Sequence, residues 1–115
     1  MLLKNLVSTL DLTVLSGENR LDTNVEFGYT SDILSDVMAR SPKHALWITN
    51  QTHENILALA YFKGLAAVIL PENLQLDDAS LGKAREKQIP VFSSEQAAFD
   101  IIGQLYELGI RGKRE

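Results

Sequence analysis

The sequence contains no cysteine, only three prolines and one tryptophan, and no apolar run as long as a membrane span. Without cysteine the chain forms no disulfide, thiolate metal site or thiol nucleophile, which is compatible with a reducing compartment. A transmembrane helix needs about 20 apolar residues, and Lys4 and Asn5 interrupt the apolar start, where a signal peptide would be unbroken. We therefore expect a cytoplasmic protein that has no membrane segment.

Positive charge is also scarce. Fifteen acids oppose eleven bases, a formal charge of −4, and the last five residues, RGKRE, hold three of the bases and one of the acids. Residues 1–110 therefore hold eight bases against fourteen acids, a charge of −6. An acidic body repels phosphate backbones, and three terminal bases are too few for a nucleic-acid footprint. We expect no nucleic-acid partner, and we interpret residues 111–115 as a solvated basic tail.

The motifs of several enzyme classes are missing. The sequence has no phosphate-binding loop of the form GxxxxGK[ST] and no GxGxxG. Its only two histidines, His44 and His53, lack the H-E-x-x-H or carboxylate spacing of a three-ligand zinc site. We predict no metal, no cofactor and no catalytic set, and we interpret the chain as a non-enzyme.

What is present is a regular alternation. The 115 residues, 45% of them hydrophobic, suit one domain that buries roughly two thirds of its unfolded surface. Strands without polar alternation, such as AAVIL and ALWI, are typical of a parallel sheet covered on both faces. We predict a three-layer α/β/α sandwich in residues 1–110, with a mostly parallel sheet built from four successive βα units: VEFGY with SDILSDVMAR, ALWIT with THENILALAYFK, AAVIL with DDASLGKAREK, and IPVF with SEQAAFDIIGQLYELG.

The segments at both ends have their own patterns. Residues 3–10 carry leucine and valine at helical spacing, which predicts a short amphipathic helix. Residues 13–16 and 25–29 are β-type runs separated by a polar stretch, which predicts a loose hairpin. The last helix is expected to end at Gly109, a residue suited to a C-cap, and to bury one stripe: Ala98, Ile101, Ile102, Leu105 and Leu108.

Polar residues gather after three predicted strands. In open parallel sheets, ligands bind outside the carboxyl ends of the strands, where helix N-termini offer free N–H groups. Helix caps use the same residue types. Ser93 with Gln96 fits a capping box, and Thr30 or Ser31 is expected to cap the second helix, with Asp32 in its first turn.

The stretch after the third predicted strand holds more polar residues than a cap requires. Thr49 to His53 are five polar residues in succession, where one would cap the helix. A helix start lined by Gln51, His53 and Asn55 suits a carboxylate, a phosphate or an amide of a neighbouring subunit. The alternative interpretation is a set of caps beside a surface histidine.

Two carboxylates precede this stretch. Asp32 and Asp36 are four residues apart and share a face if both are helical, so they suit Mg²⁺ or acid–base chemistry. A solvated helix face explains the same spacing. Trp47, inside a predicted strand, is expected in the core.

The sequence resembles the small stand-alone DRTGG-domain proteins of bacteria and archaea over nearly its whole length, on Gly28 followed by SDILSDVMAR, then LWITNQTHENILALA, AAVILPE, IPVF and FDIIGQLYELGI. That family is similar to the N-terminal domain of HPr kinase/phosphorylase, and related modules occur beside CBS domains. The resemblance implies a three-layer α/β fold, self-association and a regulatory role. The Asp-Arg-Thr-Gly-Gly residues are absent here, and the kinase's phosphate loop belongs to a separate domain, so no kinase activity is implied.

The site residues expected from the residues and the resemblance together face a common cleft at the strand ends: Asp32, Asp36, Thr49, Gln51, His53 and Asn55. The leading hypothesis is a non-catalytic sensor that binds a small anionic metabolite or nucleotide there. The alternative is a homodimeric adaptor for an enzyme complex, in which the last helix, with Phe99 and Tyr106, supplies the contact surface. The third hypothesis is a small enzyme with His53 as base and Asp32 or Asp36 as its orienting acid.

Overall fold

The computed structural model describes residues 1–113. Four βα units follow one another from residue 28 onward, as the alternation of apolar and helical segments predicts. The elements, in chain order, are α1 (Leu3–Thr9), β1 (Thr13–Ser16), the 3-10 helix η1 (Glu18–Arg20), β2 (Gly28–Thr30), α2 (Leu34–Arg40), β3 (Leu46–Ile48), α3 (Asn55–Lys63), β4 (Ala67–Leu70), α4 (Asp78–Glu86), β5 (Val91–Ser93) and α5 (Ala98–Glu107).

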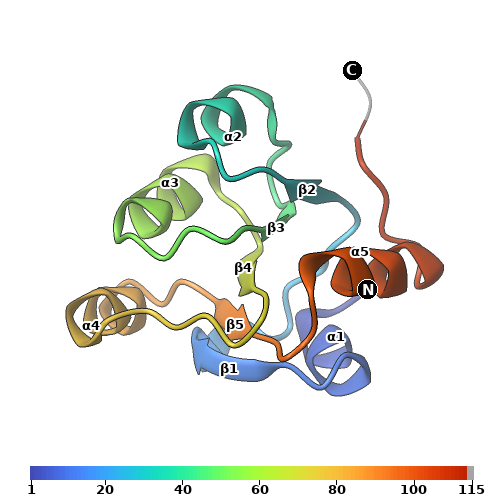
Figure 1. Ribbon diagram of the computed structural model, residues 1–115, viewed down its shortest axis with the longest axis horizontal. Helices are drawn as coiled ribbons and strands as arrows, with labels where there is room; N and C mark the ends of the chain where they lie inside the picture. The colour runs from blue at the N-terminus through green and yellow to red at the C-terminus, as the bar shows by residue number, and fades with distance from the viewer. Residues whose placement is uncertain (114–115) are drawn as a thin grey trace.

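The strands form one mostly parallel sheet. Its order is β1-β5-β4-β3-β2, with β2 to β5 parallel and β1 antiparallel to β5. Helices α2, α3 and α4 cover one face, and α1 and α5 cover the other (Figure 1). The predicted three-layer α/β/α sandwich with a mostly parallel sheet is confirmed.

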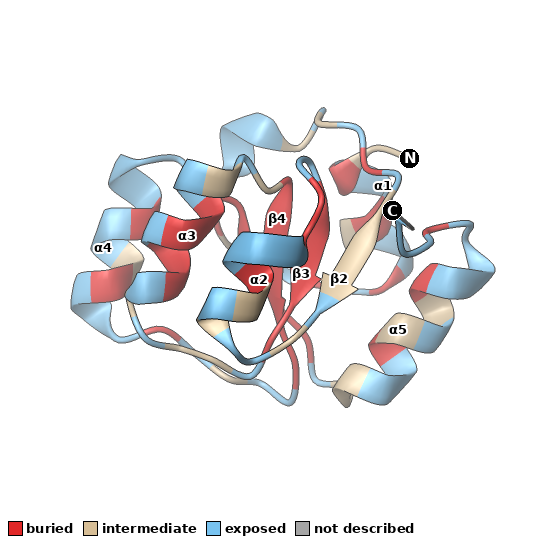
Figure 2. Cartoon of the chain, turned by 90° about the horizontal axis from the view of Figure 1, so that it is seen from above, coloured by how far each residue is buried: buried red, intermediate tan, exposed pale blue. Residues whose placement is uncertain are grey.

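Both faces of the sheet bury apolar side chains, which explains why the central strands lack polar positions. Leu46 and Ile48 pack with α1 and α5, whereas Trp47 between them packs with α2 to α4, because successive strand residues point to opposite faces. All residues of β3 and β4 are buried, whereas those of β2 are only half-buried or exposed (Figure 2). The expected core position of Trp47 is confirmed, and its indole N–H donates to the Ser31 carbonyl at 2.9 Å.

The predicted hairpin between residues 13–16 and 25–29 is wrong. β1 lies at one edge of the sheet and β2 at the other, separated by three strands. The intervening polar stretch forms η1 instead of a tight turn, and Thr23 accepts a backbone hydrogen bond from Leu3 at 2.9 Å. Both runs have strand propensity, but an isolated two-stranded hairpin is only marginally stable, whereas β2 pairs with the fully buried β3 and β1 pairs with β5.

The outer edge of β2 is covered by the end of the chain. The N–H of Gly28 donates to the Arg111 carbonyl at 3.0 Å, and Phe27 and Arg111 form a parallel bridge. The Arg111 guanidinium lies 3.6 Å from the centre of the Tyr106 ring. The predicted tail is therefore held against the domain at its first residue. The boundary at residue 110 stays a prediction, and residues 114–115 of the tail lie outside the described part.

Among the described residues, no helix has the length and apolar character that crossing a membrane requires.

Candidate functional site

The parallel strands bring their following loops to one edge of the sheet, and the loops after β2 and β3 are neighbours there. Oδ1 of Asp32 accepts hydrogen bonds from the Thr49 hydroxyl and the Asn50 backbone N–H, each at 2.8 Å, and Oδ2 accepts from the Asn50 amide at 3.2 Å. The Gln51 amide donates to the Asp32 carbonyl at 3.1 Å. Three of the predicted site residues, Asp32, Thr49 and Gln51, are thus in contact.

This network fixes the charge of Asp32. The N–H of Asn50, followed by the side chains of Thr49 and Asn50, stabilises the carboxylate and holds its pKa below its ordinary value, although partial desolvation opposes this. Asp32 is therefore ionised at neutral pH. Thr49 itself is buried and also accepts the Gln51 N–H at 3.1 Å.

A small hollow opens beside this network. Its volume is about 70 Å³, and hydroxyl, carboxylate and amide groups line it from the loops after β2 and β3, closed on one side by the start of α5. The lining residues are Thr30, Ser31, Asp32, Ile48, Thr49, Asn50 and Ala98. The hollow holds a few polar atoms of a ligand, and the rest of such a ligand would lie outside it.

Asp36 does not share a face with Asp32. Helix α2 begins at Leu34, so Asp32 precedes it and Asp36 lies in its first turn. Asp36 accepts a 2.7 Å hydrogen bond from the Tyr29 hydroxyl, and Arg40 lies 3.7 Å away. The Tyr29 hydroxyl is the main cause that lowers the pKa of Asp36, ahead of Ser31 and Arg40. The expectation that Asp32 lies in the first turn is wrong, because its carboxylate binds the loop after β3.

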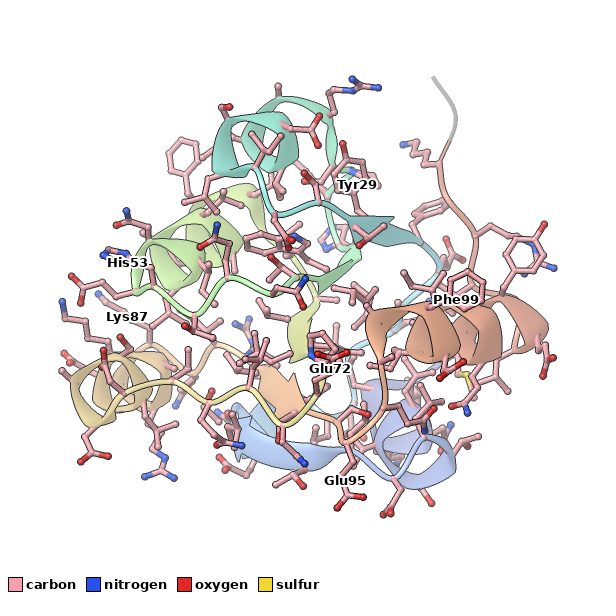
Figure 3. All side chains as sticks on the ribbon, in the orientation of Figure 1. Tyr29, His53, Glu72, Lys87, Glu95 and Phe99 are labelled. Carbon is pink, nitrogen blue, oxygen red and sulfur yellow. The ribbon has the colours of Figure 1, made fainter. Side chains whose placement is uncertain are left out.

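His53 and Asn55 stand at the start of α3, and each is exposed. Nδ1 of His53 accepts the N–H of Asn55 at 3.1 Å, which leaves Nε2 as the protonated nitrogen of the neutral ring. Figure 3 shows His53 at the outer end of α3 and Tyr29 beside β2. Among the described residues, His53 makes no hydrogen bond with Asp32 or Asp36, so the contact that the small-enzyme hypothesis requires is not formed.

The predicted helix caps are not formed as expected. Ile33 is the N-cap of α2 and makes no side-chain cap bond; Ser31 instead accepts the Ile33 N–H at 3.1 Å, and Thr30 donates to the Ile48 carbonyl. α5 begins at Ala98 with Ala97 as its N-cap, so the capping box of Ser93 and Gln96 is wrong. The N-cap of α2 therefore lies two or three residues later than the sequence pattern indicates, and the N-cap of α5 lies four residues later.

The polar residues that follow β5 make contacts of their own, with the loop after β4. Ser94 accepts the Gln96 N–H at 3.0 Å through its hydroxyl, and its carbonyl accepts the Asn73 N–H at 2.7 Å. Glu72 and Asn73 both have positive φ angles, of 55° and 57°. This junction therefore anchors the loop after β4 and is not part of the Asp32 network.

The described residues contain no group of three or more histidine, aspartate or glutamate side chains that is arranged to hold a metal ion. A much larger hollow lies elsewhere, as an apolar groove of about 890 Å³ over α3. Met38, Tyr61 and Phe62 are among its walls, with Lys87 at one side. Sequence reasoning missed this groove because its walls come from three separate helices.

Comparison with known proteins gives the family. The DRTGG domain family matches residues 5–108. The chain belongs to the DRTGG domain family. No curated protein matches its sequence.

One solved structure that resembles this DRTGG domain contains the CBS and DRTGG domains of the regulatory region of a Clostridium perfringens pyrophosphatase, complexed with the activator diadenosine tetraphosphate. The TM-score is 0.69 at 14% sequence identity, so the likeness shows the fold. The match covers 88% of this chain and 44% of the neighbour's, and this chain spans less than half the neighbour's length.

Proposed function

We propose that this DRTGG domain is a non-catalytic regulatory module that senses a nucleotide at the carboxyl ends of β2 and β3. The observation that carries the proposal is the fixed, ionised carboxylate of Asp32 beside a hollow lined by hydroxyl and amide groups. A rigid acceptor of this kind suits ligand groups that donate hydrogen bonds, such as ribose hydroxyls or an exocyclic amine.

The same carboxylate selects among small anions. A bare phosphate or carboxylate would be repelled by the ionised Asp32. A nucleotide separates its donors from its charge, so its sugar or base faces Asp32 while its phosphates extend toward the start of α3. His53 presents its Nε2–H there, and Lys83 reaches the same helix end through its 2.6 Å contact with Glu54.

The neighbouring pyrophosphatase supports this choice of ligand. Its regulatory region contains a DRTGG domain and is complexed with a nucleotide activator. The proposed contact residues are Asp32, Thr49 and Gln51, with His53 and Asn55 at the phosphate end. Asp36, whose carboxylate binds the Tyr29 hydroxyl, lies outside the proposed contact.

The test is a nucleotide titration followed by thermal unfolding and by backbone NMR shifts. Adenosine triphosphate and diadenosine tetraphosphate are compared with ribose 5-phosphate and inorganic phosphate. A ligand at 100 times its Kd stabilises the fold by about 2.7 kcal/mol. We expect this stabilisation for a nucleotide, together with shifts of the amides of residues 31–33 and 49–53.

The matched variants are Asp32→Asn and Asp36→Asn, two carboxylates four residues apart with different partners. Nucleotide binding is expected to weaken in the first variant and to persist in the second. Absence of any nucleotide effect on the wild-type domain, or equal weakening in both variants, would contradict the proposal.

A second candidate function rests on the exposed face of α5. Phe99 is 87% exposed and Tyr106 is 58% exposed, and together with Ile102 they form a stripe at helical spacing. Figure 3 labels Phe99 on α5. We infer that this stripe is the contact of a homodimer that docks onto an enzyme complex, because exposed aromatic stripes of this kind mark protein interfaces.

Light scattering over a concentration series tests the dimer. Phe99→Ser is expected to shift the domain toward monomer, while Phe62→Ser, a matched change of an 80% exposed phenylalanine on α3, leaves the mass unchanged. A wild-type domain that stays monomeric at high concentration, or a dimer abolished by Phe62→Ser alone, would exclude the α5 contact.

A further inference from the structure

Another hollow lies at the opposite ends of the strands, where β4 and β5 begin. Its volume is about 230 Å³. It is formed by four separate parts of the chain: the loop that holds η1, the turn before β3, the stretch from the end of α3 to the start of β4, and the start of β5. Its lining residues are Arg20, Thr23, His44, Ala60, Tyr61, Gly64, Leu65, Ala66, Ile89 and Pro90.

The polar side chains that line this hollow can all donate hydrogen bonds. Arg20 and His44 line it with Thr23 and Tyr61, and no carboxylate is among the lining residues of this acidic chain. Asp22, which is near Arg20 in sequence, is paired with Lys4 at 3.2 Å. Within residues 1–113, the side chains of Arg20 and His44 form no hydrogen bond or ion pair. Both side chains are exposed, so a ligand in the hollow can reach their donors.

These donors are not needed as caps for α3, the helix that ends at the hollow. The carbonyls of Ala60 and Tyr61 accept the backbone N–H groups of Leu65 and Gly64, at 3.0 and 3.3 Å. The helix end is thus satisfied by its own turn, with Gly64 at a φ of 69°. Capping of α3 does not account for Arg20 and His44 at this position.

Both donors stand on segments that the backbone holds in place. Gly17 packs so closely on Pro90 that an added Cβ would lie 2.4 Å from the Pro90 Cα, which holds the loop of η1 against the sheet. The N–H of Arg20 donates to the Gly17 carbonyl at 2.9 Å, and that of His44 donates to the Gly64 carbonyl at 2.9 Å. The two side chains are presented by fixed backbone positions, which lowers the ordering cost of binding.

We propose that this hollow binds a small molecule that carries a phosphate group. A guanidinium gives two parallel donors to phosphate oxygens, and an imidazole and a threonine hydroxyl add further donors. The volume of 230 Å³ is below the range of about 300–1,000 Å³ that is typical of drug-sized ligands. The ligand is therefore a phosphate on a body of a few carbon atoms, which packs against Tyr61 and Leu65. This site is independent of the nucleotide site at the carboxyl ends of β2 and β3.

The two histidines of the chain provide the test, because His44 lies at the amino ends of the strands and His53 lies at their carboxyl ends. Inorganic phosphate and then glycerol 3-phosphate are titrated into the full chain at constant pH and ionic strength, and the ring resonances of both histidines are followed by NMR. We expect a saturable shift of the His44 ring while the His53 ring stays unchanged. Tighter binding of glycerol 3-phosphate than of phosphate assigns a role to the carbon body.

The matched variants are Arg20→Gln and Arg40→Gln, since both arginines are exposed and Arg40 pairs with Asp36 outside the hollow. Loss of the guanidinium at position 20 is expected to raise the Kd by about tenfold or more, and the change at position 40 leaves it unaltered. Unsaturable shifts of both rings, a shift confined to His53, or full binding in Arg20→Gln would each overturn the proposal.

Discussion

The Tyr29 hydroxyl donates a 2.7 Å hydrogen bond to Oδ2 of Asp36, and this contact ties β2 to the first turn of α2. The bond favours the ionised carboxylate and is the largest cause of the lowered pKa of Asp36. It also raises the pKa of Tyr29, because the phenol gives up its hydrogen bond when it ionises.

Tyr29→Phe is therefore expected to raise the pKa of Asp36 toward its ordinary value. The loss of the hydroxyl removes the main stabilising partner of the carboxylate and keeps the ring in place. Arg40→Gln is the matched comparison and should raise the pKa by a smaller amount, since Arg40 is a weaker cause. A carboxyl-carbon NMR titration measures both, and a larger effect of Arg40→Gln would contradict the assignment.

Asp32 gives the fold a pH dependence. Its pKa is lowered in the folded state, so its contribution to stability is present above the unfolded pKa of about 3.9 and is lost as the pH falls through the folded pKa. Asp32→Asn should lower the free energy of unfolding at neutral pH by about 1 kcal/mol, because Asp32 is exposed. The difference from wild type should shrink in strong acid.

Urea unfolding of both proteins across this pH range measures the difference. Asp100→Asn is the control, since Asp100 is exposed and its side chain makes no hydrogen bond with the described residues. If the difference in the free energy of unfolding between wild type and Asp32→Asn stays constant down to the lowest pH, the Asp32 charge does not contribute to stability.

Gly17→Ala should destabilise the domain more than Gly64→Ala does. Both glycines have positive φ, 83° and 69°, so each substitution carries a backbone cost of roughly 1–2 kcal/mol. Only at Gly17 does the new methyl group meet backbone atoms, those of Pro90, which adds about 1–3 kcal/mol of overpacking. Chemical denaturation measures the loss in the free energy of unfolding of each variant, and the difference between the two losses gives the cost of the contact with Pro90. Equal losses would mean that the loop of η1 moves away from Pro90 without cost.

The sequence predicts the layers well because buried parallel strands and amphipathic helices leave strong local patterns. AVIL at residues 67–70 is buried throughout, and the spacing of Ile101 and Leu105 matches the buried face of α5. The pairing of β1 could not be predicted from such a local pattern. Its pairing with β5 joins residues about 80 positions apart, and the local pattern of 13–16 is equally compatible with a hairpin.

The candidate site was predicted in part for a similar reason. The carboxyl ends of β2 and β3 had to meet once the strands were parallel, which brought Asp32 to Thr49. The direction of the Asp32 side chain depends on where α2 begins, and helix starts are the least certain feature of a sequence pattern. Arg20 and His44 carried no signal at all, because loops that meet at the amino ends of strands share no motif.

The bridge between Phe27 and Arg111 also has a consequence for how the molecule is made. Strand β2 emerges early from the ribosome, but its outer hydrogen-bonding groups gain their partner only after residue 111 has been synthesised. Until then the nascent domain exposes an open strand, which is a site for mispairing with other chains. The β2 edge of this sheet is therefore covered only after all five strands have been synthesised.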